Sequence, residues 1–395
     1  MTAYLAALGI ASPLGIGKEA VARNLFAGSR AGLVRRTGLL PDRAIRVGDV
    51  DGPLPHVPPR LAHFDCRNNR IALAAIEEIE PAIAAAMRRY GAERVAVVMG
   101  SSTSGLAQGE AALATLRRQG AWPAEYRYSQ QELGNTAAFL AEYLGIGGPA
   151  YTISTACSSS GKVFASAERL LRLDLCDAAL VGGADALCGL TLNGFHSLEA
   201  IAADYCNPFS RNRDGINIGE GAAVFLMTRE PAAIALMGTG ESSDAYHVSA
   251  PDPSGAGALR AMRGALDAAR LPPSAIDYVN LHGTATPLND AMEGKAVAAL
   301  FGAETPCSAT KAMTGHMLGA AGAAEAAILW LSLDPDFAGG AMPPHVWDGA
   351  ADPEIPALNF ATPSARLPIR GRSAMLSNSF GFGGSNVAVV LGRGW

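Results

Sequence analysis

Short apolar runs that end in glycine or small polar residues alternate along this chain with longer stretches rich in alanine and leucine. The longer stretches read as helices, one starting near Ala107 and one over 159–173, and the apolar runs lie at 94–102, 150–157, 177–185 and 222–230. Continuous apolar runs are typical of strands that are buried on both faces. The alternation therefore predicts an α/β protein in which helices cover a largely buried sheet.

The pattern of the opening residues starts again after residue 231. The opening YLAALGIASPLG is similar to AAIALMGTGESSDAYH at 232–247, and AYTISTACS at 150–158 is similar to YVNLHGTAT at 278–286. With 395 residues, the chain is also longer than one hydrophobic core usually supports. We therefore predict two similar halves, 1–235 and 236–395, with no flexible linker between them.

Composition argues against several classes of protein. A formal net charge of −5 gives no overall basic surface for nucleic acid. No apolar run has the length of about 18 residues that a membrane-spanning helix needs, and the best candidate, 320–333, contains Glu325 and reads as a buried core helix. The apolar N-terminus lacks the basic leading region of a signal peptide. The six cysteines show no CxxC pair, so we expect reduced thiols, a cytoplasmic protein, and neither a metal nor a cofactor.

Cys157 is the candidate nucleophile. It follows a β-type run and precedes a stretch of small residues that opens an amphipathic helix. The positive end of a helix dipole and its free N–H groups favour a thiolate, so we expect a lowered thiol pKa there. The backbone N–H of Cys157 could also donate to an oxyanion. The other five cysteines we interpret as buried structural residues.

Two histidines and one lysine complete the candidate site. His282 ends an apolar run, and Lys311 lies five residues before His316, which heads a helix of small residues. Two imidazole N–H donors suit an enolate that forms on a thioester when carbon dioxide leaves. Lys311 could keep His316 a donor or assist departure of the carboxylate, and both roles stay open. The remaining histidines, His345 among them, we interpret as ordinary core or surface residues.

A glycine-rich segment near the C-terminus, LSNSFGFGGSNVAVVL at 376–391, predicts a mobile gate over a pocket. Its glycines precede a β-like run instead of a helix N-terminus, which argues against a phosphate-binding loop.

The segments TACSSS, NPFSRNRDGINIGEGA, LHGTATPLNDAMEG, TKAMTGHMLGAAGAAE and NSFGFGGSN occur in an order and spacing that resembles the β-ketoacyl-acyl carrier protein synthases I and II. The resemblance covers practically the whole chain. It implies the thiolase fold, a five-layered αβαβα arrangement of two similar halves, and a homodimer or a heterodimer with a related synthase subunit. It also implies that Cys157 takes an acyl group from an acyl carrier protein, while His282 and His316 promote decarboxylation of malonyl-carrier and stabilise its enolate.

The same resemblance assigns supporting roles. Lys311 and Glu325 would belong to one network, and the backbone N–H groups of Cys157 and Phe382 would form the oxyanion hole, with Phe382 also the gate. The residues that would contact substrate are Thr284 and Thr286 in the phosphopantetheine tunnel, Phe195 in the acyl pocket, Thr103 at the end of that pocket, and Phe380.

Some questions stay open at this point. Ser210 stands where the family often has an acidic residue. The small Thr103 leaves room for a longer or unsaturated acyl chain. An aryl polyene or other secondary pathway is therefore as plausible as fatty acid synthesis. A non-catalytic chain-length-factor-like subunit is the alternative function, which the presence of Cys157 argues against. A thioester hydrolase or simple acyltransferase would not need the second histidine and the lysine.

An acidic carrier protein needs a basic docking surface on this acidic chain. Arg67 and Arg70, which are at helical spacing, are the first candidates for that surface, and Arg127, Arg211 and Arg213 are further ones.

Overall fold

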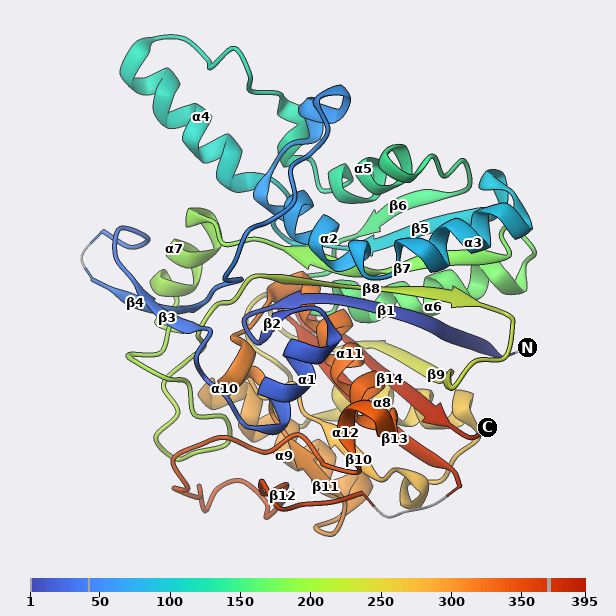
Figure 1. The fold of residues 1–395 in the computed structure, drawn as a ribbon. Helices are drawn as coiled ribbons and strands as arrows, with labels where there is room; N and C mark the ends of the chain where they lie inside the picture. The colour runs from blue at the N-terminus through green and yellow to red at the C-terminus, as the bar shows by residue number, and fades with distance from the viewer. Residues whose placement is uncertain (1, 42, 368–370) are drawn as a thin grey trace.

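The computed structural model describes residues 2–41, 43–367 and 371–395. Their main feature is a sheet of 12 strands (Figure 1). Its path runs in the order β12-β11-β10-β13-β14-β9-β1-β8-β7-β5-β6, with β2 paired to β1. The strands are β1 (Ala3–Ser12), β2 (Gly15–Ile16), β5 (Val95–Gly100), β6 (Ala150–Ile153), β7 (Ala178–Asp185), β8 (Gly221–Thr228), β9 (Ile234–Ser243), β10 (Tyr278–Asn280), β11 (Pro306–Ser308), β12 (Asn359–Phe360), β13 (Ser373–Gly381) and β14 (Ser385–Arg393).

The strand order repeats itself outward from the junction between β1 and β9. On one side the order is β1, β8, β7, β5, β6, and on the other it is β9, β14, β13, β10, β11. Equivalent pairs also share their direction: β5 is parallel to β6 and β7, as β10 is to β11 and β13, whereas the β7–β8 and β13–β14 pairs are antiparallel. The two sides meet where Ala3 pairs with Leu236 and Tyr4 with Ala235.

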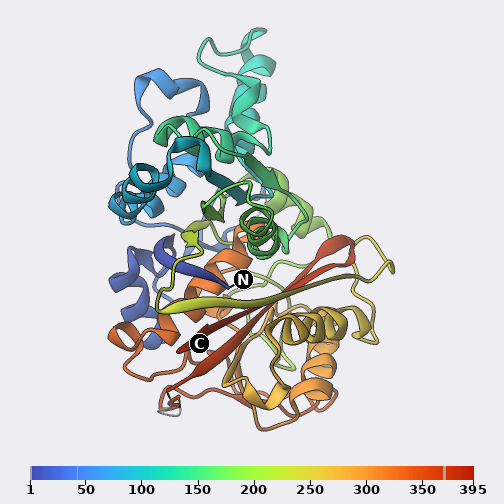
Figure 2. The same ribbon diagram turned by 90° about the vertical axis from the view of Figure 1, so that its right-hand side faces the viewer.

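Helices complete five layers. The helices α6 (Ser159–Arg172) and α11 (Ala321–Leu333) pack against each other and contact strands of both sides of the sheet, so they form the central layer. One outer layer contains α2 (Arg67–Glu77), α3 (Glu80–Tyr90) and α5 (Asn135–Leu144), and the other contains α8 (Ala256–Ala269) and α9 (Pro287–Phe301) (Figures 1 and 2). This is the thiolase fold expected from the sequence.

Smaller elements surround these layers. The hairpin of β3 (Leu33–Arg36) and β4 (Ile45–Gly48) packs against α7 (Gly189–Ser197), and α4 (Leu106–Gln119) projects from the body (Figure 1). The remaining helices are α1 (Lys18–Phe26), α10 (Lys311–Thr314) and α12 (Pro335–Ala338), and the short 3-10 turns are Pro59–Phe64, Ala92–Arg94, Tyr128–Gln131, Pro273–Ala275, Leu318–Ala320 and Phe382–Gly384.

The central layer is close-packed because glycines lie where its helices cross. A Cβ placed on Gly322 of α11 would lie 2.5 Å from the backbone N of Gly161 in α6, and one on Gly161 would lie 2.5 Å from Val387 Cγ1. All residues of α11 are buried, including Glu325, which confirms the prediction of a core helix. Within the described ranges, no helix has the length and apolarity needed to cross a bilayer.

The predicted strands at 94–102, 150–157, 177–185 and 222–230 are confirmed as β5, β6, β7 and β8. The predicted boundary between the halves needs a structural comment, because residue 235 is the second residue of β9. The boundary therefore falls inside a strand of the continuous sheet, with no linker between the halves. The two halves are distinguished only by their repeated strand order, and the boundary at 235 stays a prediction.

Candidate active site

Cys157 lies in the turn between β6 and α6, as the sequence predicts. The turn is sharp because Ala156 has φ of 54°, which is uncommon for a residue other than glycine. Only 5% of Cys157 is exposed. The backbone N–H groups of Cys157 and Phe382 both donate toward its sulfur. The turn therefore aims the thiol into the protein, at two converging backbone donors.

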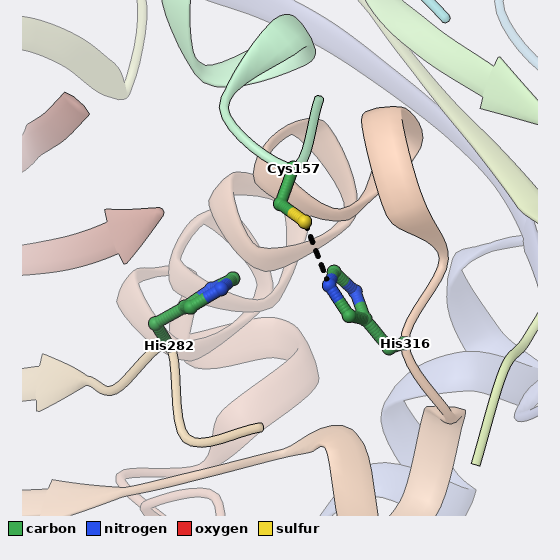
Figure 3. Close-up of side chains that lie close together, drawn as sticks. All are labelled: Cys157, His282 and His316. Atoms are coloured by element: carbon green, nitrogen blue, oxygen red, sulfur yellow. Dashed lines mark hydrogen bonds between the residues drawn. The ribbon is translucent and has the colours of Figure 1, made fainter. Parts of the chain in front are cut away.

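His282 and His316 face this thiol (Figure 3). His316 Nε2 is 3.1 Å from Cys157 Sγ, and the two imidazole rings stand nearly perpendicular with centroids 5.4 Å apart. His282 lies two residues after the end of β10, and His316 lies two residues after the end of α10. One ligand atom from each of the three residues lies within 4.8 Å of the others, a cluster that could also hold a metal ion such as zinc. The prediction of no metal stays a prediction.

Lys311 joins His282 to a buried carboxylate. Its Nζ donates to the His282 carbonyl oxygen at 2.6 Å, lies 3.3 Å from His282 Nδ1, and forms an ion pair with Glu325. An ammonium group can only donate, so Nδ1 of His282 accepts and its Nε2 carries the proton. These contacts place Lys311 against His282, so they do not decide between keeping His316 a donor and assisting departure of the carboxylate, and both roles stay predictions. The predicted Lys311–Glu325 network exists, but Lys311 contacts His282 and not His316.

Burial decides the protonation states in this site. Burial raises the pKa of Glu325 to about 7, although Lys311 opposes this. It also holds the pKa values of His282 and His316 well below their usual range, and the charge of Lys311 lowers both further. Both imidazoles are therefore neutral near pH 7, and a neutral imidazole still has one N–H group to donate.

The expected lowering of the thiol pKa at Cys157 is wrong. Burial raises its pKa to about 11, and the smaller opposing effects of Lys311 and of the two backbone N–H groups do not compensate. The turn before α6 does supply donors, but desolvation of the thiolate outweighs them. Cys157 thus rests as a thiol, and the neutral His316 beside it is the group able to accept its proton.

A cavity of about 380 Å³ opens onto Cys157, His282 and His316. Of the predicted substrate-binding residues, Thr284, Thr286, Phe195 and Phe380 line it, together with Phe382. The hydroxyl groups of Thr284 and Thr286 are 2.9 Å apart, so the two act as one polar patch. Apolar side chains that line the wall include Leu198, Ala200, Ile216 and Leu288.

Thr103 is buried away from this lining, as far as the described chain shows. Its hydroxyl donates to Asp185 at 2.8 Å and accepts from the Ala186 N–H at 3.1 Å. The predicted place at the end of the acyl pocket therefore does not correspond to the cavity of this single chain.

The glycine-rich segment forms the turn between β13 and β14. Gly383 and Gly384 have φ of 81° and 74°, which favour glycine. Phe382, which is 38% exposed, packs on Phe195 with ring centroids 5.3 Å apart. The prediction that a β-like run follows the glycines is confirmed by β14. Phe382 and Phe195 both line the cavity, and the gate role of Phe382 stays a prediction.

Three polar residues around the site make contacts that the sequence did not predict, namely the buried Glu293 and Asn386 and the half-buried Asp244. The carboxylate of Glu293 accepts from the backbone N–H groups of His282 and Gly283, each at 2.7 Å. Asn386 donates to Asp244 at 2.7 Å, and both line the cavity. Glu293 lies 10 and 11 residues from its two partners, and Asn386 lies 142 residues from Asp244, so neither contact follows from a local sequence pattern.

Four of the five arginines proposed for carrier docking have side-chain partners within the chain, and the fifth, Arg211, is exposed. Arg67 pairs with the fully buried Glu220 and with Asp49, and Arg70 pairs with Asp65 at 2.6 Å. Arg213 pairs with Asp352 at 2.5 Å, while Arg127 donates to carbonyl groups of its own loop. A docking role for these residues stays a prediction, but Arg67 has a structural role in addition.

The sequence matches two family descriptions over most of its length. Residues 5–233 match "Beta-ketoacyl synthase, N-terminal domain", and residues 233–345 match "Beta-ketoacyl synthase, C-terminal domain". Among curated relatives, 3-oxoacyl-[acyl-carrier-protein] synthase 1 of Haemophilus influenzae is 34% identical over 68% of this chain and 67% of the relative. Synthase 2 of Staphylococcus aureus is 30% identical over 85% of this chain and 86% of the relative.

Solved structures give the same result. A chain in the complex of the ketosynthase ApeO with its chain length factor ApeC from Xenorhabdus doucetiae is 44% identical, with a TM-score of 0.94 over 99% of this chain and 98% of that one. A beta-ketoacyl synthase from Burkholderia phymatum is 26% identical, with a TM-score of 0.87 over 99% of each chain.

Proposed function

Because this chain belongs to the β-ketoacyl synthase family, we propose that it is a 3-oxoacyl-acyl carrier protein synthase whose acyl group is held on Cys157. The observation that carries this proposal is the position of the Cys157 thiol, 3.1 Å from the neutral His316 and facing the second imidazole of His282 at a cavity. A condensing acyltransferase needs a nucleophile, a base for it and enolate donors, and this cluster supplies all three.

The first step transfers an acyl group from the carrier thioester to Cys157. His316 Nε2 accepts the thiol proton as Sγ attacks the acyl carbon. The bond between the acyl carbon and the carrier sulfur then breaks, and the departing thiolate takes the proton from His316. The backbone N–H groups of Cys157 and Phe382 stabilise the tetrahedral oxyanion, since both already converge on this point.

The second step forms the carbon-carbon bond. Malonyl-carrier loses carbon dioxide, and the electron pair of the broken bond becomes an enolate on the thioester. His282 Nε2–H donates to that oxygen, with its direction fixed by Lys311 at Nδ1. We assign the second donor to His316, whose neutral ring must then carry its proton on Nε2 instead of Nδ1. The carbanion attacks the acyl carbon on Cys157, and the Sγ–C bond breaks. The released Cys157 thiolate takes up one proton from water and becomes the resting thiol again, and the product leaves on the carrier with two more carbons.

The cavity lining supports separate binding regions for the phosphopantetheine arm and for the acyl chain. Thr284 and Thr286 offer hydroxyls to the phosphopantetheine arm, whereas Phe195, Phe380 and Ile216 offer apolar surface to the acyl chain. The substrates are therefore acyl and malonyl thioesters of an acyl carrier protein, for fatty acid or polyketide-type synthesis. Thr103 is proposed for the far end of the acyl site only where a partner subunit extends it.

We also propose that the working form is a dimer. The similarity to a chain from a complex of a ketosynthase with its chain length factor supports a related subunit as partner. The alternative is that this chain is itself the non-catalytic subunit, and the complete Cys157, His282 and His316 cluster argues against it. A cytoplasmic location is supported by six free cysteines without a disulfide.

The test is condensation of purified protein with acyl carrier protein that is loaded with saturated chains of graded length, followed by malonyl-carrier. Mass spectrometry of the carrier should show a 3-oxoacyl product two carbons longer, and His282→Ala should lose this product while Cys157 is still acylated. If no donor gives a product with folded protein, either alone or with a partner subunit co-expressed, the proposed function is wrong.

A further inference from the structure

His345 is a buried imidazole that the proposed chemistry does not use. It is 7% exposed and lies outside the cavity lining, after α12. Its Nδ1 accepts from the Ala309 N–H at 3.1 Å, and its Nε2 lies 3.1 Å from the carbonyl oxygen of Pro208. A backbone N–H can only donate and a carbonyl can only accept, so the proton is on Nε2. Both nitrogens of one neutral ring are thus occupied by backbone groups.

Three aromatic rings fix the orientation of this imidazole. It stacks on Phe360 with centroids 4.1 Å apart and an angle of 12°, and Trp347 and Phe209 meet it edge-on at 5.2 and 6.2 Å. Burial lowers the pKa of His345 to about 3, so the ring stays neutral near pH 7 and keeps one donor and one acceptor. The sequence-based view of His345 as an ordinary core residue does not account for this full set of contacts.

One of the two bonded segments leads directly to the catalytic pair. Ala309 lies two residues before Lys311, and its Cβ fills the space beside Gly283, the neighbour of His282. A Cβ added to Gly283 would lie 2.3 Å from that of Ala309 and 3.2 Å from the Phe209 ring. The position of Ala309 therefore sets where the Lys311 ammonium meets the His282 ring.

The other bonded segment is a peptide unit held at both of its polar atoms. His345 donates to the Pro208 carbonyl, and the N–H of Phe209 in the same peptide donates to the buried Asp290 at 2.7 Å. Phe209 has φ of 62°, an uncommon conformation for a bulky residue that persists only where its surroundings impose it. The two bonds supply that constraint.

The route from His345 to His316 is longer. It first follows the chain from Pro208 to Cys206, whose N–H donates to Asn217 Oδ1 at 2.9 Å. The His316 N–H then donates to the backbone carbonyl of Asn217 at 2.6 Å. Cys206 Sγ also contacts the Lys311 carbonyl oxygen at 3.6 Å. His345 is thus one hydrogen bond from the Lys311 segment and several from His316.

We propose that His345 is a positioning residue that holds the Lys311–His282 pair in the geometry for decarboxylation, through its bonds to Ala309 and Pro208. The inference rests on the proposed function. Because its direct link is to the Lys311 side, loss of its hydrogen bonds affects the malonyl step and leaves transfer of the acyl group to Cys157 nearly unchanged.

The test compares two steps in three variants. His345→Phe keeps a stacked ring but loses both hydrogen bonds, and His345→Gln keeps a donor and an acceptor. Phe360→Leu is the matched control, since it removes the stacking partner and leaves the hydrogen bonds. The rates measured are acylation of Cys157, by intact mass, and consumption of malonyl-carrier by the pre-acylated enzyme, each in a single turnover.

For His345→Phe we expect malonyl consumption to fall at least ~10-fold, with acylation within about 2-fold of wild type. His345→Gln should restore most of the loss, and Phe360→Leu should lower thermal stability without this split. If both steps fall together in every variant, or if His345→Phe is unchanged, His345 has only a structural role. Should His345→Phe not fold, His345→Asn, which is too short to make both bonds, takes its place in the same comparison. Failure of wild type to condense would refute the proposed function instead.

Discussion

At the scale of single residues, the protonation of Cys157 is the main result. A cysteine at the start of a helix invites the expectation of a thiolate, and the helix and its N–H groups are present. The thiol is nevertheless buried, and burial raises its pKa to about 11. Activation must then come from transfer of the proton to His316 as the acyl group arrives, and not from a thiolate already present.

This gives a prediction for chemical labelling. Alkylation of Cys157 by iodoacetamide should be slow at pH 7 and should rise about tenfold per pH unit between about pH 7 and 9, because only the thiolate reacts. The measurement is the rate of mass increase of intact protein, with Cys157→Ala as the control for labelling of the other five cysteines. Fast labelling that does not change with pH would show a preformed thiolate and contradict the account.

His345 makes a separate prediction about acid stability. The folded imidazole stays neutral because its pKa is lowered from 6.5 to about 3, whereas the unfolded one takes a proton below 6.5. This contribution to stability is therefore present above pH 6.5 and is lost as the pH falls toward 3. Between about pH 7 and pH 5 the wild type should lose about 2 kcal/mol of unfolding free energy from this residue alone.

Urea unfolding at the two pH values measures this effect. His282 and His316 have lowered pKa values of the same sign, so only the difference between wild type and His345→Gln isolates His345. The variant should lose less stability on acidification. Equal losses in both proteins would mean that His345 titrates normally in the folded state.

At the scale of elements, the crossing of α6 and α11 positions the chemistry. Cys157 lies just before α6, and Glu325 lies in α11. The two helices approach closely because Gly322 has no side chain where it meets the backbone of Gly161. A methyl group on Gly322 meets backbone atoms of α6, which cannot move without the whole helix. The glycines thus determine the distance between the nucleophile and the Lys311–Glu325 pair.

We therefore expect Gly322→Ala to lower the unfolding free energy by about 2 kcal/mol and to reduce condensation more than its folded fraction explains. Gly264→Ala in α8 is the control, because a Cβ there lies at an ordinary 3.4 Å from Gly240 Cα. That change should be neutral or stabilise by up to about 1 kcal/mol, as alanine is the better helix former. Wild-type activity and stability in Gly322→Ala would contradict the close-packed crossing.

What the sequence could predict follows from how local each feature is. The β6–turn–α6 unit with Cys157, and the residues His282, Lys311 and His316, lie in contiguous motifs, so their types and places were readable. The partners of His345, Ala309 and Pro208, are 36 and 137 residues away from it, and no periodicity links them. Burial also depends on the whole packing, which is why the direction of the thiol pKa was missed.

At the scale of the whole molecule, surface charge bears on how an acidic partner protein could dock. The chain has a formal net charge of −5, and its proposed partner is an acidic carrier. Arg67, which was proposed for docking with Arg70, also forms an ion pair with the buried Glu220. Charge reversal there would leave Glu220 without a partner, so it would confuse docking with folding.

Arg67→Ala should lower the unfolding free energy by about 3 kcal/mol, at the low end for a broken buried pair because Arg67 is partly exposed. Arg127→Ala, which loses only bonds within its own loop, should change stability by less than about 1 kcal/mol. Denaturant unfolding of both variants checks this. If Arg67→Ala is as stable as Arg127→Ala, the ion pair with Glu220 has no structural role, and docking becomes the better account of Arg67.

The central claim is that Cys157 receives the acyl group. It is tested most directly by the intact mass of wild type and Cys157→Ala after mixing with acyl carrier protein loaded with a panel of acyl chains. We predict that wild type gains the mass of one acyl group, that peptide mapping places it on Cys157, and that Cys157→Ala gains none. An acyl group on another residue, or no acylation of folded wild type by any donor in the presence of a partner subunit, would contradict the account.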